Sequence, residues 1–192
     1  MLASVRESGR IATCSSNLRQ IGLATTLYAN DNNDYYPPVG PFPVAPGLAG
    51  SWPNRIYPYV KSEAVFQCPS LPDGDFKLGG SPETVITSQT GEYWHNGSYV
   101  RNMLSLEGMF FGVRQSHLRH PSSTILLLDG KVGDFLVNPG KGPLNTVDDL
   151  TTAGLAKRHR DGVNVLMADG HAKWMKFENL LQRSLWTVRE TS

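Results

Sequence analysis

The first thirty residues carry a helical apolar pattern, and this pattern constrains the fold more than any other feature of the chain. The residues that define it follow one another at spacings of three or four, and they are Ile11, Cys14, Leu18, Ile21, Thr25 and Tyr28. This spacing places them on one face of an α-helix. Ser4 and Glu7 have the spacing of a capping box, and a polar cluster at 30–34 supplies a stop. We therefore predict a helix from about Ser4 to Ala29, roughly 40 Å long. Its predicted packing face contains Ile11, Leu18, Ile21 and Tyr28.

Two later segments, 124–132 and 164–172, each run apolar residues into an Asp-Gly pair. Asp-Gly favours the centre of a type I′ turn, because both central residues of that turn need positive φ. A hairpin centred on Asp169-Gly170 places Met167 opposite Ala172 and gives an antiparallel sheet with one apolar face. We predict that this face packs under the N-terminal helix. The face contains Val163, Val165, Met167, Ala172 and Trp174.

The middle of the chain is rich in residues that interrupt regular structure. Seven of the 13 prolines lie between Pro37 and Pro58, so we predict no helix or central strand there. A short helix is expected within 60–68, loops with short extended pieces over 71–102, and a short helix or last strand over 178–186. Together these elements predict one α+β domain over 1–192. Its parts are a helix over 1–30, an irregular region over 31–123, and a sheet with a C-terminal segment over 124–192.

Charge and composition exclude several classes of protein. The chain has 18 Lys and Arg against 17 Asp and Glu, so bulk electrostatics do not favour binding to nucleic acid. No apolar run reaches the roughly 18 residues that span a bilayer. The two cysteines, Cys14 and Cys68, exclude a disulfide-dense scaffold and a four-cysteine zinc site. Spacing alone leaves open whether they are bonded or free, because it gives no separation between their Cα atoms.

A group of titratable residues near the C-terminal end raises the question of a hydrolytic or metal site. The group is His159, Asp161, Asp169 and His171. An extended strand of about ten residues separates His159 from Asp169 by roughly 30 Å, and the hairpin already uses Asp169 as a turn residue. We therefore favour Asp169 as a turn residue and His159 as a hydrogen-bonded histidine on the surface or in a loop.

The remaining polar and aromatic candidates have structural interpretations. The cluster at 30–34 lacks the spacing of a calcium loop, so we interpret it as a helix-terminating turn. The acidic pairs are interpreted as loop carboxylates, and they are Asp73, Asp75, Asp148 and Asp149. Aromatic residues in the middle region either line a ligand groove or pack loops over the sheet, and we favour packing. These residues are Trp52, Tyr57, Tyr59, Tyr93, Trp94 and Tyr99.

Three motifs resemble those of one family. His159, nine further residues and then Asp169-Gly170 resemble the H-X9-DG signature of prepilin-like proteins found in planctomycete and lentisphaera genomes. The segment from Cys14 to Ala24, with sequence CSSNLRQIGLA, is similar to the region that follows the membrane helix of that family. Phe66–Ser70, with sequence FQCPS, is similar to its middle motif.

The resemblance implies a pilin-like α+β fold and a structural subunit of a type II secretion pseudopilus or type IV pilus-like filament. Such proteins begin with a leader cut by prepilin peptidase and an apolar anchor, neither of which is in this sequence. The implied protein is the soluble head of an inner-membrane-anchored precursor, on the periplasmic or cell-surface side. Its partners would be other pilin-like subunits and the peptidase, with no nucleic acid and with membrane contact only through the anchor.

The resemblance also bears on the candidate residues. A head in an oxidising compartment implies a bond between Cys14 and Cys68. No catalytic role, cofactor or metal follows from the motif, so we expect a protein that is not an enzyme, with His159 as an orienting hydrogen-bond partner. The alternatives are an exported ligand-binding module that uses the aromatic loops and, less favoured, a hydrolase that uses His159 and Asp169.

Overall fold

The computed structural model describes residues 2–37, 52–70, 99–102, 113–130, 136–137, 145–152 and 155–186. Its helices are α1 (Leu2–Asp31), α2 (Trp52–Val60) and α4 (Val147–Thr152). Its strands are β1 (Tyr99–Asn102), β2 (Ile125–Asp129), β3 (Leu136–Val137), β4 (Gly162–Met167) and β5 (Ala172–Lys176). Single 3₁₀ turns lie at Glu63–Phe66, Gln115–His117, Phe177–Leu181 and Arg183–Leu185. None of the helices in these ranges is long and apolar enough to cross a membrane.

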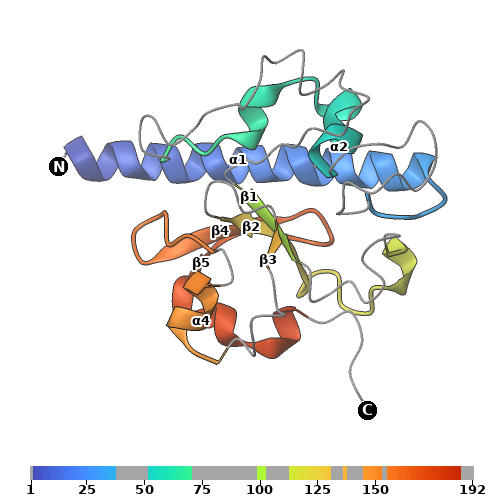
Figure 1. Cartoon of the computed structure of the whole chain (residues 1–192). Coiled ribbons are helices and arrows are strands. Elements are labelled where there is room, and N and C mark those ends of the chain that lie inside the picture. Colours follow the sequence, from blue (N-terminus) through green and yellow to red (C-terminus); the bar gives the residue numbers. More distant parts are fainter. Residues whose placement is uncertain are drawn as a thin grey trace.

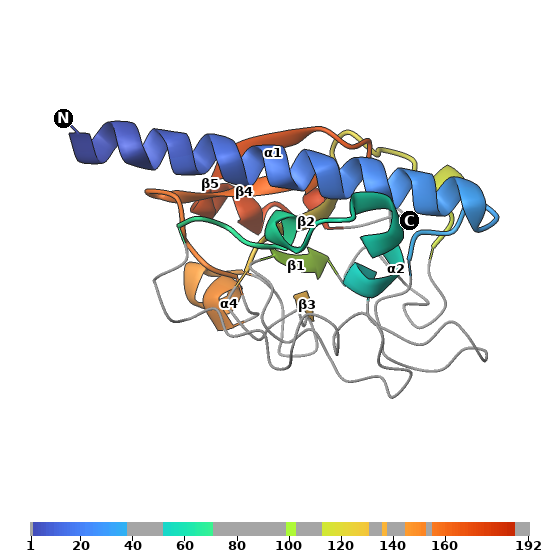
Figure 2. The ribbon, with the colours of Figure 1, turned by 90° about the horizontal axis from the view of Figure 1, so that it is seen from above.

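The long N-terminal helix is confirmed. It runs the length of the molecule and lies over β4 and β5, as Figures 1 and 2 show from two directions. Leu18, Ile21 and Tyr28 of the predicted packing face are buried, and Ile11 is half-buried. The predicted capping box is wrong, because α1 begins at Leu2 and the Ser4 carbonyl accepts a hydrogen bond from Ser8 Oγ inside the helix.

The strands form one sheet in the order β3-β1-β2-β4-β5. The β1–β2, β2–β4 and β4–β5 pairs are antiparallel, and β1–β3 is parallel. Figure 1 shows α1 on one side of this sheet, α2 on the far side of α1, and α4 with the C-terminal 3₁₀ turns on the other side of the sheet. The predicted α+β, pilin-like fold class is thus confirmed.

The register of the β4–β5 hairpin differs from the predicted one. Leu166 pairs with Ala172 and Val165 with Lys173, one residue away from the prediction. Within this hairpin loop only Gly170 has positive φ, and the Gly170 amide donates to the Met167 carbonyl. This is a type I turn followed by a left-handed glycine, the usual three-residue hairpin loop. An Asp-Gly pair suits this turn as well as a type I′ turn, because only the glycine needs positive φ.

Both faces of β4 are buried, whereas the sequence pattern predicted a single buried apolar face. Leu166 and Ala168 pack with α1, α2 and the turn at 63–66. Val163, Val165 and Met167, which were predicted to lie under α1, instead form a second core with α4 and the C-terminal turns. The second core exists because the segment 177–186 supplies buried Phe177, Leu180, Leu185 and Trp186.

Helix α2 contradicts the prediction that the prolines exclude a helix up to Pro58. Pro53 lies in the first turn of α2, where a backbone N–H has no acceptor within the helix, so its absence in proline costs no helical hydrogen bond. Pro58 lies near the other end, so only one interior hydrogen bond is lost. Trp52 and Ile56 are buried on one face of α2 against the first core. This burial supplies the stabilisation that the backbone lacks.

Replacing Gly162 by alanine should lower the free energy of unfolding by about 3 kcal/mol, because overpacking a strand against backbone leaves no room to relax. An added Cβ would meet the Met175 carbonyl oxygen of β5 far inside contact distance and the Trp174 ring at 2.5 Å. Gly9→Ala is the matched control, because nothing lies within 4 Å of its Cβ position. In the helix this change should stabilise by about 0.5–1 kcal/mol. Urea denaturation measures the free energy of unfolding of both variants. Equal changes in the two would contradict the close packing of Gly162 against β5.

Candidate functional site

His159 lies in a tight turn that leads into β4. The His159 amide donates to the Gly162 carbonyl and the Gly162 amide donates to the His159 carbonyl, at 3.1 and 3.0 Å. Arg160 between them has a φ of 56°. The His159 carbonyl also accepts a hydrogen bond from Trp174 Nε1 at 3.1 Å. His159 is fully buried, so the predicted surface position is wrong, whereas the alternative of a hydrogen-bonded loop histidine agrees with its place in this turn.

The imidazole ring is surrounded by groups from three separate parts of the chain. Nδ1 lies 3.2 Å from Glu7 Oε1 of α1 and 3.4 Å from Ser70 Oγ. Nε2 lies 3.3 Å from Cys68 Sγ and 3.4 Å from Asp129 Oδ2 at the end of β2. Each ring nitrogen therefore faces a carboxylate oxygen. We call His159, Glu7, Cys68 and Asp129, together with Cys14, the histidine cluster.

Asp129 is the fully buried carboxylate of this cluster. Its Oδ2 accepts a hydrogen bond from the Asn164 amide of β4 at 2.6 Å, whereas its Oδ1 has no hydrogen-bond partner among the described residues. Burial raises the pKa of Asp129 to about 6, and His159, the Asn164 amide and Arg158 oppose that rise. The prediction that Asp129-Gly130 forms a hairpin turn is wrong, because Asp129 pairs with Tyr99 of β1 as the last residue of β2.

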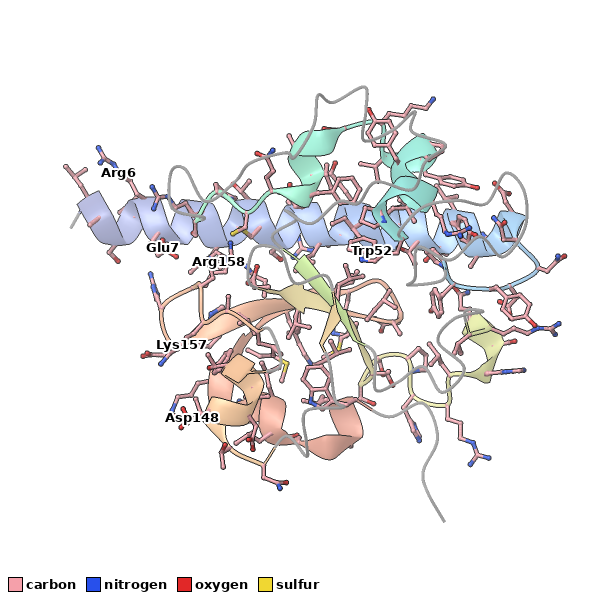
Figure 3. All side chains as sticks on the ribbon, in the orientation of Figure 1. Arg6, Glu7, Trp52, Asp148, Lys157 and Arg158 are labelled. Atoms are coloured by element: carbon pink, nitrogen blue, oxygen red, sulfur yellow. A yellow bond between two sulfur atoms is a disulfide. The ribbon has the colours of Figure 1, made fainter. Side chains whose placement is uncertain are left out.

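Cys14 and Cys68 are joined by a disulfide with a Cα–Cα distance of 5.2 Å. The bond, which the resemblance implied, fastens the middle of α1 to the segment after the 63–66 turn. Asn17 Nδ2 reinforces the connection by donating to the Gln67 carbonyl at 2.8 Å. Figure 3 shows the disulfide against α1, with Glu7 and Arg158 in the region between α1 and the strands. The disulfide and the buried imidazole thus form one continuous cluster.

The other half of the sequence motif lies elsewhere. Asp169 and Gly170 form the β4–β5 turn, as predicted in place though not in turn type. Asp169 Oδ1 lies 2.6 Å from Nδ1 of His171, and that histidine is 44% exposed. His159 and Asp169 each have different partners, so the described residues contain no His159–Asp169 pair of the kind a hydrolase would use.

Two of the other predicted carboxylates, Asp34 and Asp149, accept hydrogen bonds that hold local structure. Asp34 accepts hydrogen bonds from the Ser116 hydroxyl and amide, which hold its pKa below the ordinary value. Asp149 accepts from the Thr146 and Asn145 amides at the start of α4, and the Thr146 hydroxyl and amide lead the causes that lower its pKa. Asp148 is exposed (Figure 3). Asp73 and Asp75 lie outside the described residues.

Three of the predicted aromatic residues pack against the helices. Trp52 is buried with its ring edge-to-face on Phe66. Tyr57 and Tyr59 are half-buried, and the Tyr59 hydroxyl donates to Asp31 Oδ2 at 2.8 Å. Tyr93, Trp94 and the side chain of Tyr99 lie outside the described residues. Packing is thus the role of the aromatic side chains that the structure places.

A surface groove of about 400 Å³ lies beside the cluster, lined by Ser8, Ile11, Arg160, Asp161 and Trp174. Trp174 is 43% exposed there. Arg160 donates to Ser8 Oγ at 2.9 Å, and Asp161 pairs with Lys157 at 3.1 Å. The polar groups of the groove are therefore already engaged.

Sequence reasoning missed Asp129 and Glu7 as neighbours of His159, and Asn164 as a partner of Asp129. Two of them had other assignments, Asp129 to a turn and Glu7 to a helix cap. A signal for Asp129 was present, because this carboxylate directly follows four apolar residues of a strand. A carboxylate at the end of a buried strand needs a polar partner inside the protein.

Comparison with known proteins gives one match. Searches of curated proteins and of solved structures found no significant similarity. A family model matches residues 3–68. This segment contains α1 from Ala3 onward, α2 and both cysteines, and it ends before His159. Over residues 3–68 the chain is similar to the family described as a protein of unknown function (DUF1559).

Proposed function

We propose that this chain is the head of a structural, pilin-like subunit that assembles into a type II secretion pseudopilus or a type IV pilus-like filament. The observation that carries the proposal is the distribution of apolar residues around α1. One face of the helix is buried in the molecule, and the opposite face is also apolar in part. That second face has no cover among the described residues.

The uncovered face of α1 has four large apolar residues. They are Leu2, Val5, Leu23 and Leu27, with exposed fractions of 75%, 66%, 63% and 41%. Gly9, Ala12 and Ser16 lie between the two pairs at helical spacing and are also exposed. Small residues let two helices approach closely, and large apolar residues favour burial against a neighbour. We call this set the outer face of α1, and we propose that it packs against neighbouring subunits.

The proposal includes an apolar anchor that precedes α1 in the precursor and a leader cut by prepilin peptidase. Leu2 and Val5 support it, because the end of α1 that bears them projects past the sheet (Figure 1). The disulfide supports a head on the periplasmic or cell-surface side, since structural disulfides persist in oxidising compartments. We propose neither an enzymatic activity nor a nucleic-acid partner for it.

The precursor should lose its leader only in cells that contain prepilin peptidase. Expression of the full-length precursor with and without the peptidase, followed by mass spectrometry of its N-terminus, measures this. A precursor with an unaltered N-terminus in peptidase-containing cells, or a full-length protein found soluble in the cytoplasm, would contradict the proposal.

A second candidate function is a ligand-binding module exported by the same route. The specific observation in its favour is the groove at Trp174, because an exposed indole beside polar side chains can stack on a sugar ring. In this case saccharides should quench Trp174 fluorescence in a saturable manner, and Trp174→Ala should abolish the response. Arg160 and Asp161 are already bonded to Ser8 and Lys157 and so are less available to a ligand, which makes the structural function the better supported one.

A further inference from the structure

We propose that reduction of the Cys14–Cys68 disulfide converts the histidine cluster into a binding site for zinc or a similar divalent transition-metal ion. The ligands would be Cys14 Sγ, Cys68 Sγ, His159 Nε2 and one oxygen of Asp129. The inference does not depend on filament assembly, since it concerns the interior of the head alone.

The positions of the ligand atoms carry the proposal. All four lie within 4.8 Å of one another. A tetrahedral zinc ion with bonds of about 2.3 Å to sulfur and 2.0–2.2 Å to nitrogen or oxygen needs ligand atoms roughly 3.3–3.8 Å apart. Cys68 Sγ and His159 Nε2 are 3.3 Å apart, and His159 Nε2 and Asp129 Oδ2 are 3.4 Å apart. These two edges of the tetrahedron therefore already exist, and the bonded sulfurs are the pair that must separate.

The groups around the ligands are those that a metal site uses to orient them. A histidine that binds metal through one ring nitrogen usually donates the other N–H to a carboxylate. Glu7 Oε1 is in that position, 3.2 Å from His159 Nδ1. The Asn164 amide fixes Asp129 Oδ2, and Asp129 Oδ1 is buried with no hydrogen-bond partner in the described part of the chain. An unpartnered buried carboxylate oxygen is what a cation would satisfy.

The chemistry of the donor set selects the class of ion. Two thiolates and an imidazole favour zinc, cobalt and similar ions over calcium and magnesium, which prefer oxygen ligands. All four ligand residues are at most 2% exposed, so a bound ion would be shielded from water. The Glu7 side chain, which contacts His159 Nδ1, is 25% exposed.

Reduction and metal binding balance as two steps. A dithiol reductant transfers two electrons and two protons to the disulfide, which becomes two thiols while the reductant becomes a disulfide. The metal ion then binds both sulfurs as thiolates and releases the two thiol protons to solvent. His159 binds as the neutral imidazole through Nε2, with its proton on Nδ1 facing Glu7.

Cobalt titration of the 192-residue chain tests the proposal. The protein is reduced with a phosphine, which becomes its phosphine oxide, and is then titrated without oxygen. The reduced chain should bind one equivalent of Co²⁺ and show the intense visible bands of a tetrahedral thiolate site, whereas the oxidised chain should show none. Should reduction weaken the fold, one equivalent of Zn²⁺ should restore the near-UV circular dichroism.

Variants separate a built site from two cysteines that bind metal by themselves. His159→Gln and Asp129→Asn should each weaken Co²⁺ binding at least tenfold, whereas His171→Gln in the exposed His171–Asp169 pair should leave it unchanged. The proposal is overturned if the reduced chain binds no cobalt, if Zn²⁺ leaves a reduced and unfolded chain unfolded, or if His159→Gln and Asp129→Asn bind as tightly as the wild type.

Discussion

Replacing both Cys14 and Cys68 by alanine should lower the free energy of unfolding by about 4 kcal/mol. The bond closes a loop with a sequence separation of 54 residues. In the chain-entropy model the loss of that closure gives the unfolded chain about 4 kcal/mol of additional freedom. Typical domains have 5–15 kcal/mol of net stability, so this single bond accounts for a large share.

Urea denaturation of the double variant and of the wild type, both with a metal chelator present, measures the loss. Alanine is the replacement of choice because both positions are buried and a serine hydroxyl would need a partner there. The wild type after reduction is the matched control, and its midpoint should fall close to that of the double variant. A difference below about 1 kcal/mol between double variant and wild type would contradict a stabilising bond.

The helix α1 could be predicted from sequence because its signal is local and repeats over about five turns, from Ile11 to Tyr28. The position of the hairpin at Asp169-Gly170 could be predicted, but the pairing register of its two strands could not, since an Asp-Gly pair suits two turn types. A shift of one residue moves every side chain of a strand to the opposite face. The register error therefore placed Ala172 and Trp174 of β5 on the face of Val163, Val165 and Met167. The choice of the face under α1 was wrong for a different reason, because both faces of β4 carry apolar residues and either could have packed against the helix.

The candidate site was predictable only in part, because its contacts join distant segments. The H-X9-DG spacing identified His159, but its two carboxylate neighbours, Glu7 and Asp129, lie 152 residues away and on a different strand. Local patterns gave each of them a plausible local role in a cap or a turn. Helix α2 was missed for a similar reason, since burial of Trp52 and Ile56 against α1 outweighs the local effect of Pro58.

The double variant Leu23→Glu/Leu27→Glu should fold as the wild type does and fail to assemble. Both residues lie on the outer face of α1, with 63% and 41% of their surface exposed, so the isolated head loses little packing. Glutamate is a good helix former, and two like charges four residues apart cost only about 0.2–0.5 kcal/mol. In an assembled interface, however, each change removes about 1.5–3 kcal/mol of apolar burial and adds a charge without a partner.

Val147→Glu is the matched control for this variant. Val147 is an apolar residue of α4 with 39% of its surface exposed, and α4 lies on the side of the sheet away from α1 (Figure 1). One glutamate placed there should leave assembly unchanged. Equal thermal midpoints of the three purified heads show that folding is not the cause of any difference.

The most direct test of the filament proposal is the amount of protein in filaments sheared from the surface of cells that produce the wild type, the double variant or Val147→Glu. At equal total levels, the proposal predicts that wild type and Val147→Glu appear in the sheared fraction and that the double variant falls at least tenfold. Absence of the wild type from that fraction would contradict a cell-surface filament, and equal amounts of all three proteins in it would contradict the role of the outer face of α1 in assembly.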